Sequence, residues 1–519
     1  MRYTITGNFQ YDLGLYGLKK LLDFFEEDYR SGEFYIETDK KPEEILKLVI
    51  LKQIADRGAG FFLLKILNEL KIDSKKLKEE TISIDIDLHS LVKEQKSLDS
   101  VINRIGDEIF SKLTQKFPEH ADSINSEVIK EILWNKSVEL LNSILHNFQA
   151  DKKARGKLAF DKAIQKLYKD MNEEYSCSFC GKKPARRISR DTFFFAPAQL
   201  NAFWFNEASI FICSHCLASN LAVTQALSFM DRKTAVAVYV PNLHDMEVLN
   251  EGLQVQDLVQ LTLKVIARYI LKYEAAIRDL QVIEFYLDSQ EPKMEFYILT
   301  EETIKNLIRI HDELRKLQEK YHNILIGEIK DRKGYKRVNL LEETLKCIFQ
   351  NQNLFYFVHR FAKLSFMAES FRQNRMRKPP LKGFYPLGLL KILNLHFKLS
   401  GGLRMVNFEA FKEYGQNLSR KIYSQLKERG GFDPNTYNNK KISLANAFLN
   451  ASKGDLRQFM ETLTRVIITY NAPINNELLS MINENTYREI STLIALSIMA
   501  ELPAKNSSKN KENQAESVL

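Results

Sequence analysis

The strongest constraint on the fold is a pair of short cysteine motifs in the middle of the chain. They are Cys177-Ser-Phe-Cys180 and Cys213-Ser-His-Cys216. Two intervening residues let both thiolates of one turn hold a tetrahedral ion, and Gly181 supplies the tight turn that such a motif favours. Four of the five cysteines fall into these pairs, so the spacing predicts a closed zinc site with a structural role. Spacing alone leaves an iron–sulfur cluster open.

Basic residues without an acidic neighbour follow the first cysteine pair. They are Lys182, Lys183, Arg186, Arg187 and Arg190. Cationic side chains on a metal-stapled loop suit contacts with phosphate, so we interpret them as nucleic-acid-binding residues. The aromatic runs at 193–195 and 203–205 could stack on bases, but the sequence favours a small core of the insert itself.

Two further basic clusters lie later in the chain. One comprises Arg372, Arg375, Arg377, Lys378 and Lys382, and the other comprises Lys330, Arg332, Lys333, Lys336 and Arg337. We predict the first of these as a second nucleic-acid-binding surface. The chain has 75 Lys and Arg against 66 Asp and Glu, a formal charge of +9. This mild excess is therefore an average over local patches.

Composition places the chain among ordinary core-forming proteins. With 519 residues, 45% of them hydrophobic and 27% charged, it is neither a disordered, a collagen-like nor a disulfide-scaffold sequence. No apolar run approaches the ~18 residues of a membrane helix, and the N-terminus lacks the apolar stretch of a signal peptide. We therefore expect a cytoplasmic protein with no membrane partner.

Hydrophobic periodicity predicts an α+β fold dominated by helices. Strands are expected at 3–6, 33–37, 81–88, 235–240, 282–287 and 294–299, and helices include 13–25, 221–230 and 255–273. From residue 340 onward the pattern is helical. The predicted domains are an N-terminal α+β region (1–174), a zinc-binding insert (175–217), a continuation with a β-hairpin (218–371), a C-terminal helical bundle (372–502) and a disordered tail (503–519).

Motifs for enzymatic chemistry are sparse. The sequence has neither a GxGxxG nor a GxxxxGK[ST] phosphate loop, and it lacks HExxH and GxSxG. Two dipeptides, His244-Asp245 and His311-Asp312, leave open a metal-dependent nuclease or phosphohydrolase. A zinc-containing scaffold that binds only protein is a third reading of the chain.

The N-terminus resembles a known family. Its motif residues are Thr6-Gly7-Asn8, followed by Asp12 and Gly14 before a helix. This pattern is similar to the opening of the large subunit of type I CRISPR interference (Cascade) complexes, in the branch named for its CXXC–CXXC region. Phe9 stands where that motif has proline. The central cysteine pairs, the length and the helical C-terminal end agree with the family.

The resemblance implies a protein that is not an enzyme. Such subunits bind the 5′ end of the CRISPR guide RNA, recognise the PAM in target double-stranded DNA, and dock the Cascade backbone and small subunits and a separate helicase-nuclease. Guide pairing then reads the sequence, so the protein needs phosphate contacts rather than a reaction centre. In some members the C-terminal bundle is also made separately from an internal start, for which Met405 is the candidate here.

Overall fold

The structure is a computed structural model of the full chain, and most of its residues are described below. The described residues are 1–7, 9–57, 62–63, 66–67, 87–116, 125–144, 155–169, 171–187, 211–230, 234–272, 280–286, 293–330, 334–373, 380–382, 386–400, 406–428 and 433–501. Met405, the candidate internal start, lies outside them, as do residues 81–86 of the strand predicted at 81–88. The last two residues of that prediction belong to a helix instead, because Asp87 caps a helix that begins at Leu88.

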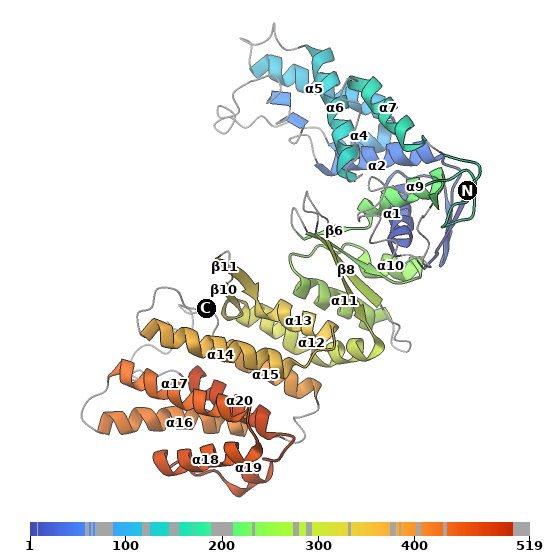
Figure 1. The fold of residues 1–519 in the computed structure, drawn as a ribbon. Coiled ribbons are helices and arrows are strands. Elements are labelled where there is room, and N and C mark those ends of the chain that lie inside the picture. Colours follow the sequence, from blue (N-terminus) through green and yellow to red (C-terminus); the bar gives the residue numbers. More distant parts are fainter. Residues whose placement is uncertain are drawn as a thin grey trace. The chain divides into compact units, whose positions relative to one another are not determined.

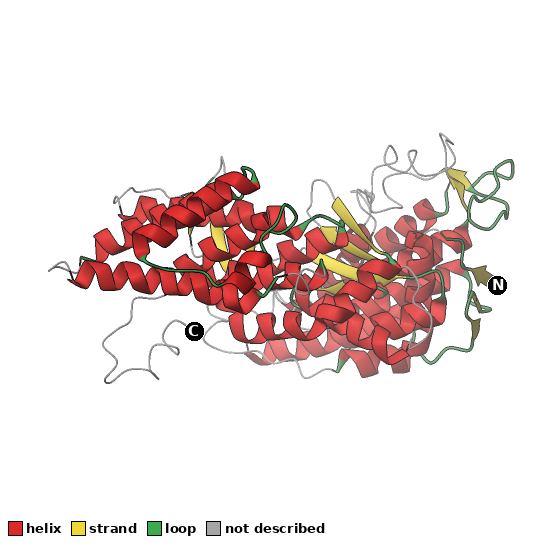
Figure 2. Ribbon diagram, turned by 90° about the horizontal axis from the view of Figure 1, so that it is seen from below, coloured by secondary structure: helices red, strands yellow, loops and turns green. Residues whose placement is uncertain are grey.

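The chain forms two compact units. Unit 1 comprises residues 1–254 and 280–296, and unit 2 comprises residues 255–279 and 297–519. Helices predominate in both, with a few small sheets (Figure 2), so the described residues confirm the helix-dominated α+β class. The five sequence-based segments remain a prediction. No described helix is long and apolar enough to cross a membrane.

Unit 1 combines short strands with helices (Figure 1). Its helices are α1 (Phe9–Phe24), α2 (Pro42–Arg57), α4 (Leu88–Gln95), α5 (Leu98–Lys116), α6 (Ser126–Ile144), α7 (Gly156–Leu167), α9 (Ser214–Leu221), the 3₁₀ helix η3 (Ala222–Gln225) and α10 (Leu243–Asn250). Its strands are β1 (Arg2–Thr4), β2 (Arg30–Gly32), β3 (Tyr35–Glu37), β4 (Arg186–Arg187), β5 (Phe211–Ile212), β6 (Ser228–Phe229), β7 (Thr234–Tyr239) and β8 (Leu280–Tyr286), while β9 (Lys293–Leu299) continues into unit 2.

Three sheets organise unit 1. Their strand orders are β1-β3-β2, β4-β5 and β6-β7-β8-β9. Strand β7 is central in the largest sheet, and its residues from Ala235 to Tyr239 are buried. Asn250 at the end of α10 completes the hydrogen bonding of this strand, because its side chain accepts from the Val238 N–H at 2.8 Å and donates to the Val238 carbonyl at 2.6 Å. Because the N–H and carbonyl groups of Val238 have hydrogen-bond partners, the strand can be buried without leaving them unsatisfied.

Unit 2 is mainly helical. Its elements are α11 (Leu258–Lys272), α12 (Glu301–Tyr321), the 3₁₀ helix η4 (His322–Ile324), β10 (Ile326–Lys330), β11 (Tyr335–Asn339), α13 (Leu340–Phe349), α14 (Leu354–Gln373), β12 (Leu381–Lys382), α15 (Pro386–Leu399), α16 (Phe408–Glu428), α17 (Pro434–Ala451), α18 (Leu456–Tyr470), α19 (Asn476–Ser480) and α20 (Tyr487–Ala500). The strands form one sheet in the order β11-β10-β12.

Helix α20 is the core helix of the C-terminal bundle. It contacts α14, α15, α16, α17 and α18 (Figure 1), and every residue from Ile490 to Ile498 is buried. A helix that is buried on all sides over nine residues has to be surrounded by other elements. Caps start the neighbouring helices: Asp433 accepts from the N–H groups of Asn435 and Thr436 at the start of α17, ahead of Pro434 at its first position.

Most sequence-based elements of the described residues are present, and two regions differ. The predicted helix at 221–230 is the short η3 followed by strand β6, because Ser228 and Phe229 pair with β7 and this tertiary contact overrides the helical pattern. Strands β10 and β11 were not expected, since β11 is rich in basic residues and β10 contains Gly327. The hairpin strands expected at 282–287 and 294–299 correspond to β8 and β9.

A buried lysine gives the bundle a defined pH dependence. Lys441 is 5% exposed and its ammonium donates to the Glu501 carbonyl at the end of α20. Burial lowers the pKa of Lys441 from 10.5 to about 8, because desolvation disfavours the charged form. Between these values the unfolded chain holds a proton that the folded chain has lost, so folding becomes more favourable as the pH rises.

We therefore expect wild type to gain stability relative to Lys441→Met between pH 8 and pH 10.5. The limit of the gain is about 3 kcal/mol, the free energy that corresponds to the pKa shift. Urea unfolding of both proteins at several pH values measures it, and the difference between them removes the contribution of tyrosine titration. Parallel pH profiles for the two proteins would show that Lys441 is not responsible.

Candidate metal centre

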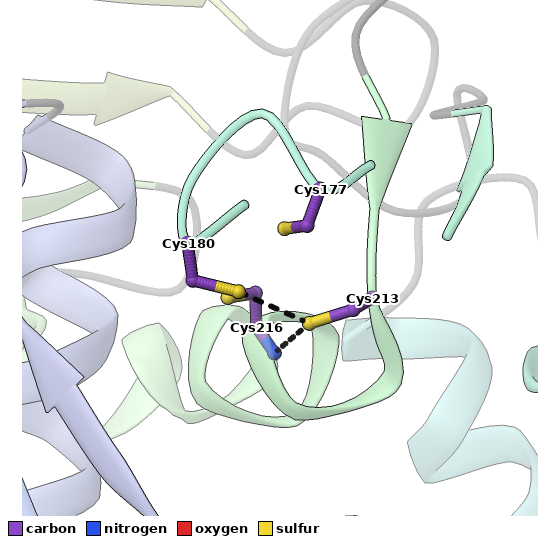
Figure 3. A group of neighbouring side chains, drawn as sticks. All are labelled: Cys177, Cys180, Cys213 and Cys216. Carbon is purple, nitrogen blue, oxygen red and sulfur yellow. Dashed lines mark hydrogen bonds between the residues drawn. The ribbon is translucent and has the colours of Figure 1, made fainter. Parts of the chain in front are cut away.

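The structure brings the four predicted cysteine ligands together. The sulfur atoms of Cys177, Cys180, Cys213 and Cys216 all lie within 4.8 Å of one another (Figure 3), and none forms a disulfide. Among the described residues this is the one group of three or more His, Cys, Asp or Glu side chains with metal-site geometry. The four cysteines can therefore hold a metal ion.

The first pair lies in a tight loop. The Gly181 N–H donates to the Cys177 carbonyl at 2.8 Å, and the Cys177 N–H donates to the Lys182 carbonyl at 2.9 Å. Gly181 has a φ of 72°, a conformation that side chains other than glycine rarely adopt. The turn predicted from the sequence thus aims Cys177 and Cys180 at the same point.

The second pair lies where a strand becomes a helix. Cys213 follows β5 and caps α9, because its sulfur accepts from the Cys216 N–H at 3.5 Å. Antiparallel pairing of β4 with β5 joins the two halves, and the Ser178 N–H donates to the Phe211 carbonyl at 2.9 Å. We refer to residues 175–187 and 211–225 as the cysteine module.

Sulfur chemistry at this site favours a cation. Cys177, Cys213 and Cys216 are at most 3% exposed, and the Cys180 and Cys213 sulfurs are 3.5 Å apart. Hydrogen bonds from the other three cysteines lower the pKa of Cys177, whereas hydrogen bonds with its own three cysteine neighbours raise the pKa of Cys216. Four thiolates so close together repel one another unless a positive ion lies between them. The edges between sulfurs in a tetrahedron with ~2.3 Å metal–sulfur bonds are about 3.8 Å, a length below the 4.8 Å within which all four sulfurs lie.

The N-terminal motif packs directly on the cysteine module. A Cβ atom at Gly14 would lie 2.6 Å from the Ser219 carbonyl oxygen of α9, so only glycine permits this approach of α1. Three residues earlier, Tyr11 stacks on Phe179 with ring centroids 5.1 Å apart, and its hydroxyl is 3.6 Å from the Cys216 sulfur. The N-terminal motif and the cysteine module are therefore far apart in sequence but packed together in the fold.

Asp12 shapes the turn that precedes α1. This carboxylate is fully buried and accepts from the N–H groups of Thr6 at 2.8 Å and Gly7 at 2.9 Å, and from the Tyr239 hydroxyl at 2.9 Å. Burial raises the pKa of Asp12, although each of these hydrogen bonds favours the ionised form. Asp12 and Gly14 thus have structural roles in the motif, while Asn8 lies outside the described residues.

The basic residues of the cysteine module divide into exposed and buried ones. Lys182, Lys183 and Arg187 are exposed, and we call these three the module patch. The Lys182 ammonium lies 2.7 Å from the Met1 sulfur. Arg186 is 8% exposed, so its side chain lies inside the cysteine module. Arg190 and the aromatic runs lie outside the described residues.

The second and third basic clusters meet on one sheet. The register places Lys382 of β12 and Arg337 of β11 on opposite sides of Glu328 in β10. Lys330, Lys336 and Arg337 are exposed. Of the other members, Arg372 lies on α14, whereas the following residues lie outside the described part of the chain: Arg332, Lys333, Arg375, Arg377 and Lys378.

A further basic surface on the bundle was missed by the sequence analysis. Arg360 and Lys363 are exposed on α14, and exposed Lys453, which follows α17, lies within electrostatic reach of His359. None of the three cations forms an ion pair with another described residue. We call Arg360, Lys363 and Lys453 the bundle patch.

An aromatic side chain borders the bundle patch. Tyr356 is 63% exposed one turn before Arg360, and exposed Arg488 lies close to it. In the sequence these side chains recur at positions i, i+4, i+7 and i+11, which lie on one face of a helix. The residues are Tyr356, Arg360, Lys363 and Met367. A search for consecutive basic residues does not detect such a repeat.

Neither of the two His-Asp dipeptides forms a metal site among the described residues. His244 is on the first turn of α10, where its Nδ1 is 3.9 Å from a Glu247 carboxylate oxygen. On α12, the His311 Nδ1 is 3.8 Å from Asp312. Each histidine thus has one acidic neighbour, fewer ligands than a catalytic metal site needs.

Comparisons with known proteins add no relative. No protein-family model matches the chain, and no curated protein and no solved structure matches it either. The functional argument therefore rests on the residues themselves.

The hydrogen bonds to Asp12 predict the effect of an isosteric change. Asp12→Asn replaces one acceptor oxygen by an NH₂ group that faces the buried donors of the turn, so about 1–3 kcal/mol of stability should be lost at pH 7. Urea unfolding measures the loss. Asp99→Asn is the matched control: Asp99 is exposed and pairs with Lys157 at 2.5 Å, so it should stay within about 0.5 kcal/mol of wild type. Equal losses in both variants would contradict a special role for Asp12.

Proposed function

We propose that the chain is the non-catalytic large subunit of a type I CRISPR surveillance complex, which binds the guide RNA 5′ end and recognises the PAM in double-stranded target DNA. The observation that carries the proposal is the packing of the N-terminal motif on the cysteine module. Gly14 lies against Ser219 and Tyr11 against Cys216. The two sequence features that resemble the family thus belong to one structural unit.

Zinc is the proposed ion of the metal centre. The cluster offers four sulfur ligands and no open position, which is typical of structural zinc sites. Zinc bound there would supply folding free energy and fix the orientation of the loop that bears the module patch. Catalysis by this ion is not part of the proposal.

We expect one Zn²⁺ per chain after purification without added metal. Cys213→Ser and Cys216→Ser should abolish stoichiometric zinc and destabilise unit 1, because each removes a thiolate and leaves an incomplete site. Elemental analysis measures the zinc and iron contents, and Cys347→Ser provides the control, since Cys347 lies in α13 of unit 2. One or more irons per chain with visible absorption would instead identify an iron–sulfur cluster.

Two cationic surfaces support nucleic-acid binding. The module patch lies next to the metal centre in unit 1, and the bundle patch lies on unit 2 beside exposed Tyr356. Lysine and arginine side chains that contact phosphates release counterions, which produces salt-dependent affinity. An exposed ring near cations can in addition stack on an unpaired base.

Charge removal should weaken the assembly with RNA and DNA. We expect full-length protein that is co-expressed with its guide RNA and backbone subunits to purify with both, and the complex to bind PAM-containing duplex DNA. The triple alanine variant of the module patch and that of the bundle patch should each reduce the salt dependence, lowering the slope of log K against log salt by up to about 3 units.

The matched control removes two lysines and one arginine from elsewhere in unit 1. Lys41, Lys47 and Arg155 are exposed and belong to neither patch. Binding isotherms at four or more salt concentrations give the slopes. Unchanged slopes for both patch variants would overturn the assigned surfaces, and a chain that never assembles with guide RNA or backbone subunits would overturn the proposed function.

A further inference from the structure

Two tyrosines of the N-terminal segment lie near the metal centre, and their hydroxyl groups have a possible function that their packing alone does not explain. Tyr3 belongs to β1 and Tyr11 to the first turn of α1, and both are 1% exposed. We call Met1–Gly7 with Phe9–Phe24 the N-terminal segment. Its side chains come from outside the cysteine module, so they do not belong to the four-ligand set itself.

The Tyr11 hydroxyl is already in contact with a ligand sulfur. It lies 3.6 Å from the Cys216 Sγ, within hydrogen-bonding distance for sulfur. With the thiol protonated, the S–H can donate to the tyrosine oxygen. A metal-bound thiolate has no proton, so the tyrosine O–H has to donate to the sulfur instead.

The Tyr3 hydroxyl is a buried polar group that needs a partner. Its oxygen has no hydrogen-bond partner among the described residues, and it lies within electrostatic reach of Cys216 and Cys213. An unsatisfied buried hydroxyl is costly, and the negative charge of metal-bound thiolates would stabilise its O–H dipole. Strand β1 fixes its position, because Tyr3 pairs with Ile36 of β3.

A four-thiolate zinc centre has the charge that these hydroxyls suit. Zn²⁺ with four thiolates carries a net charge of about −2, and a buried charge requires hydrogen-bond donors around it. The Cys216 N–H supplies one donor at 3.5 Å from the Cys213 sulfur. Tyrosine hydroxyls are further donors, and they require no counter-charge inside the protein.

We infer that Tyr11 donates an O–H···S hydrogen bond to the metal-bound Cys216 thiolate, that the buried Tyr3 hydroxyl turns its dipole toward the same negative charge, and that both couple the N-terminal segment to the metal. Both residues are positioning residues for the ion. The turn at Thr6 and Gly7 lies between them in sequence, so ion binding also holds this turn in place. The inference rests on metal binding at the four cysteines and is independent of nucleic-acid binding.

The test uses the full-length chain and Zn²⁺. Competition with a chelator of known affinity should show that Tyr3→Phe and Tyr11→Phe each weaken Zn²⁺ binding by about 10–100-fold, the usual effect of removing a polar group that supports the ligands of a metal ion. Tyr437→Phe is the matched control: Tyr437 is also 1% exposed, and its hydroxyl bonds to Ser419 in unit 2. Its Zn²⁺ affinity should equal that of wild type.

A second measurement needs no variant. Hydrogen exchange of the amides at residues 1–24 in wild type should become faster when Zn²⁺ is removed, while the amides of α20 should not change. Wild-type Zn²⁺ affinity in both Tyr3→Phe and Tyr11→Phe, or unchanged exchange at residues 1–24, would overturn the inference. A chain that binds no metal at all would overturn the zinc proposal as well, which separates the two failures.

Discussion

Contact between helices α1 and α9 is the constraint on which unit 1 depends. Helix α9 carries Cys216, and α1 reaches it only because a Cβ at Gly14 is absent. Close-packed interiors leave no space for even one methyl group at such a crossing. The position of α1 then determines where Asp12 and Tyr11 lie, so the turn before the helix and the surroundings of the cysteines follow from one steric condition.

The metal centre could be predicted because the two cysteines of each pair are close together in the sequence. Both ligands of a pair lie within one turn, so the spacing of Cys177 and Cys180 fixes their mutual distance whatever the rest of the chain does. The approach of α1 to α9 has no such local signal. Nothing in residues 9–24 indicates which surface Gly14 faces, and the resemblance marked the motif residues without saying what they touch.

Helices and strands with a clear hydrophobic pattern could be predicted from the sequence, whereas those with a weak pattern could not. Strand β7 and helix α11 have continuous apolar patterns and appear close to their expected bounds. Strand β11 alternates poorly, and its Lys336 and Arg337 suggested only a basic cluster. Pairing with β10 is a tertiary contact that overrides the low strand propensity. The bundle patch could not be predicted for the same reason, because its residues come from α14 and from the turn between α17 and α18, which are distant in sequence.

Charge distribution is the property that links the fold to the proposed partner. An excess of +9 spread evenly over 519 residues would give each region a weak and unspecific attraction. Here the module patch lies beside the four cysteines, and Arg360 and Lys363 of the bundle patch lie on helix α14, which packs against the buried α20. Rigid mounting matters because a cation on an ordered backbone loses less conformational freedom when it contacts a phosphate. The proposed binding of nucleic acid therefore depends on these local groups of cations, which would release counterions from the phosphates that they contact, and not on the net charge of the chain.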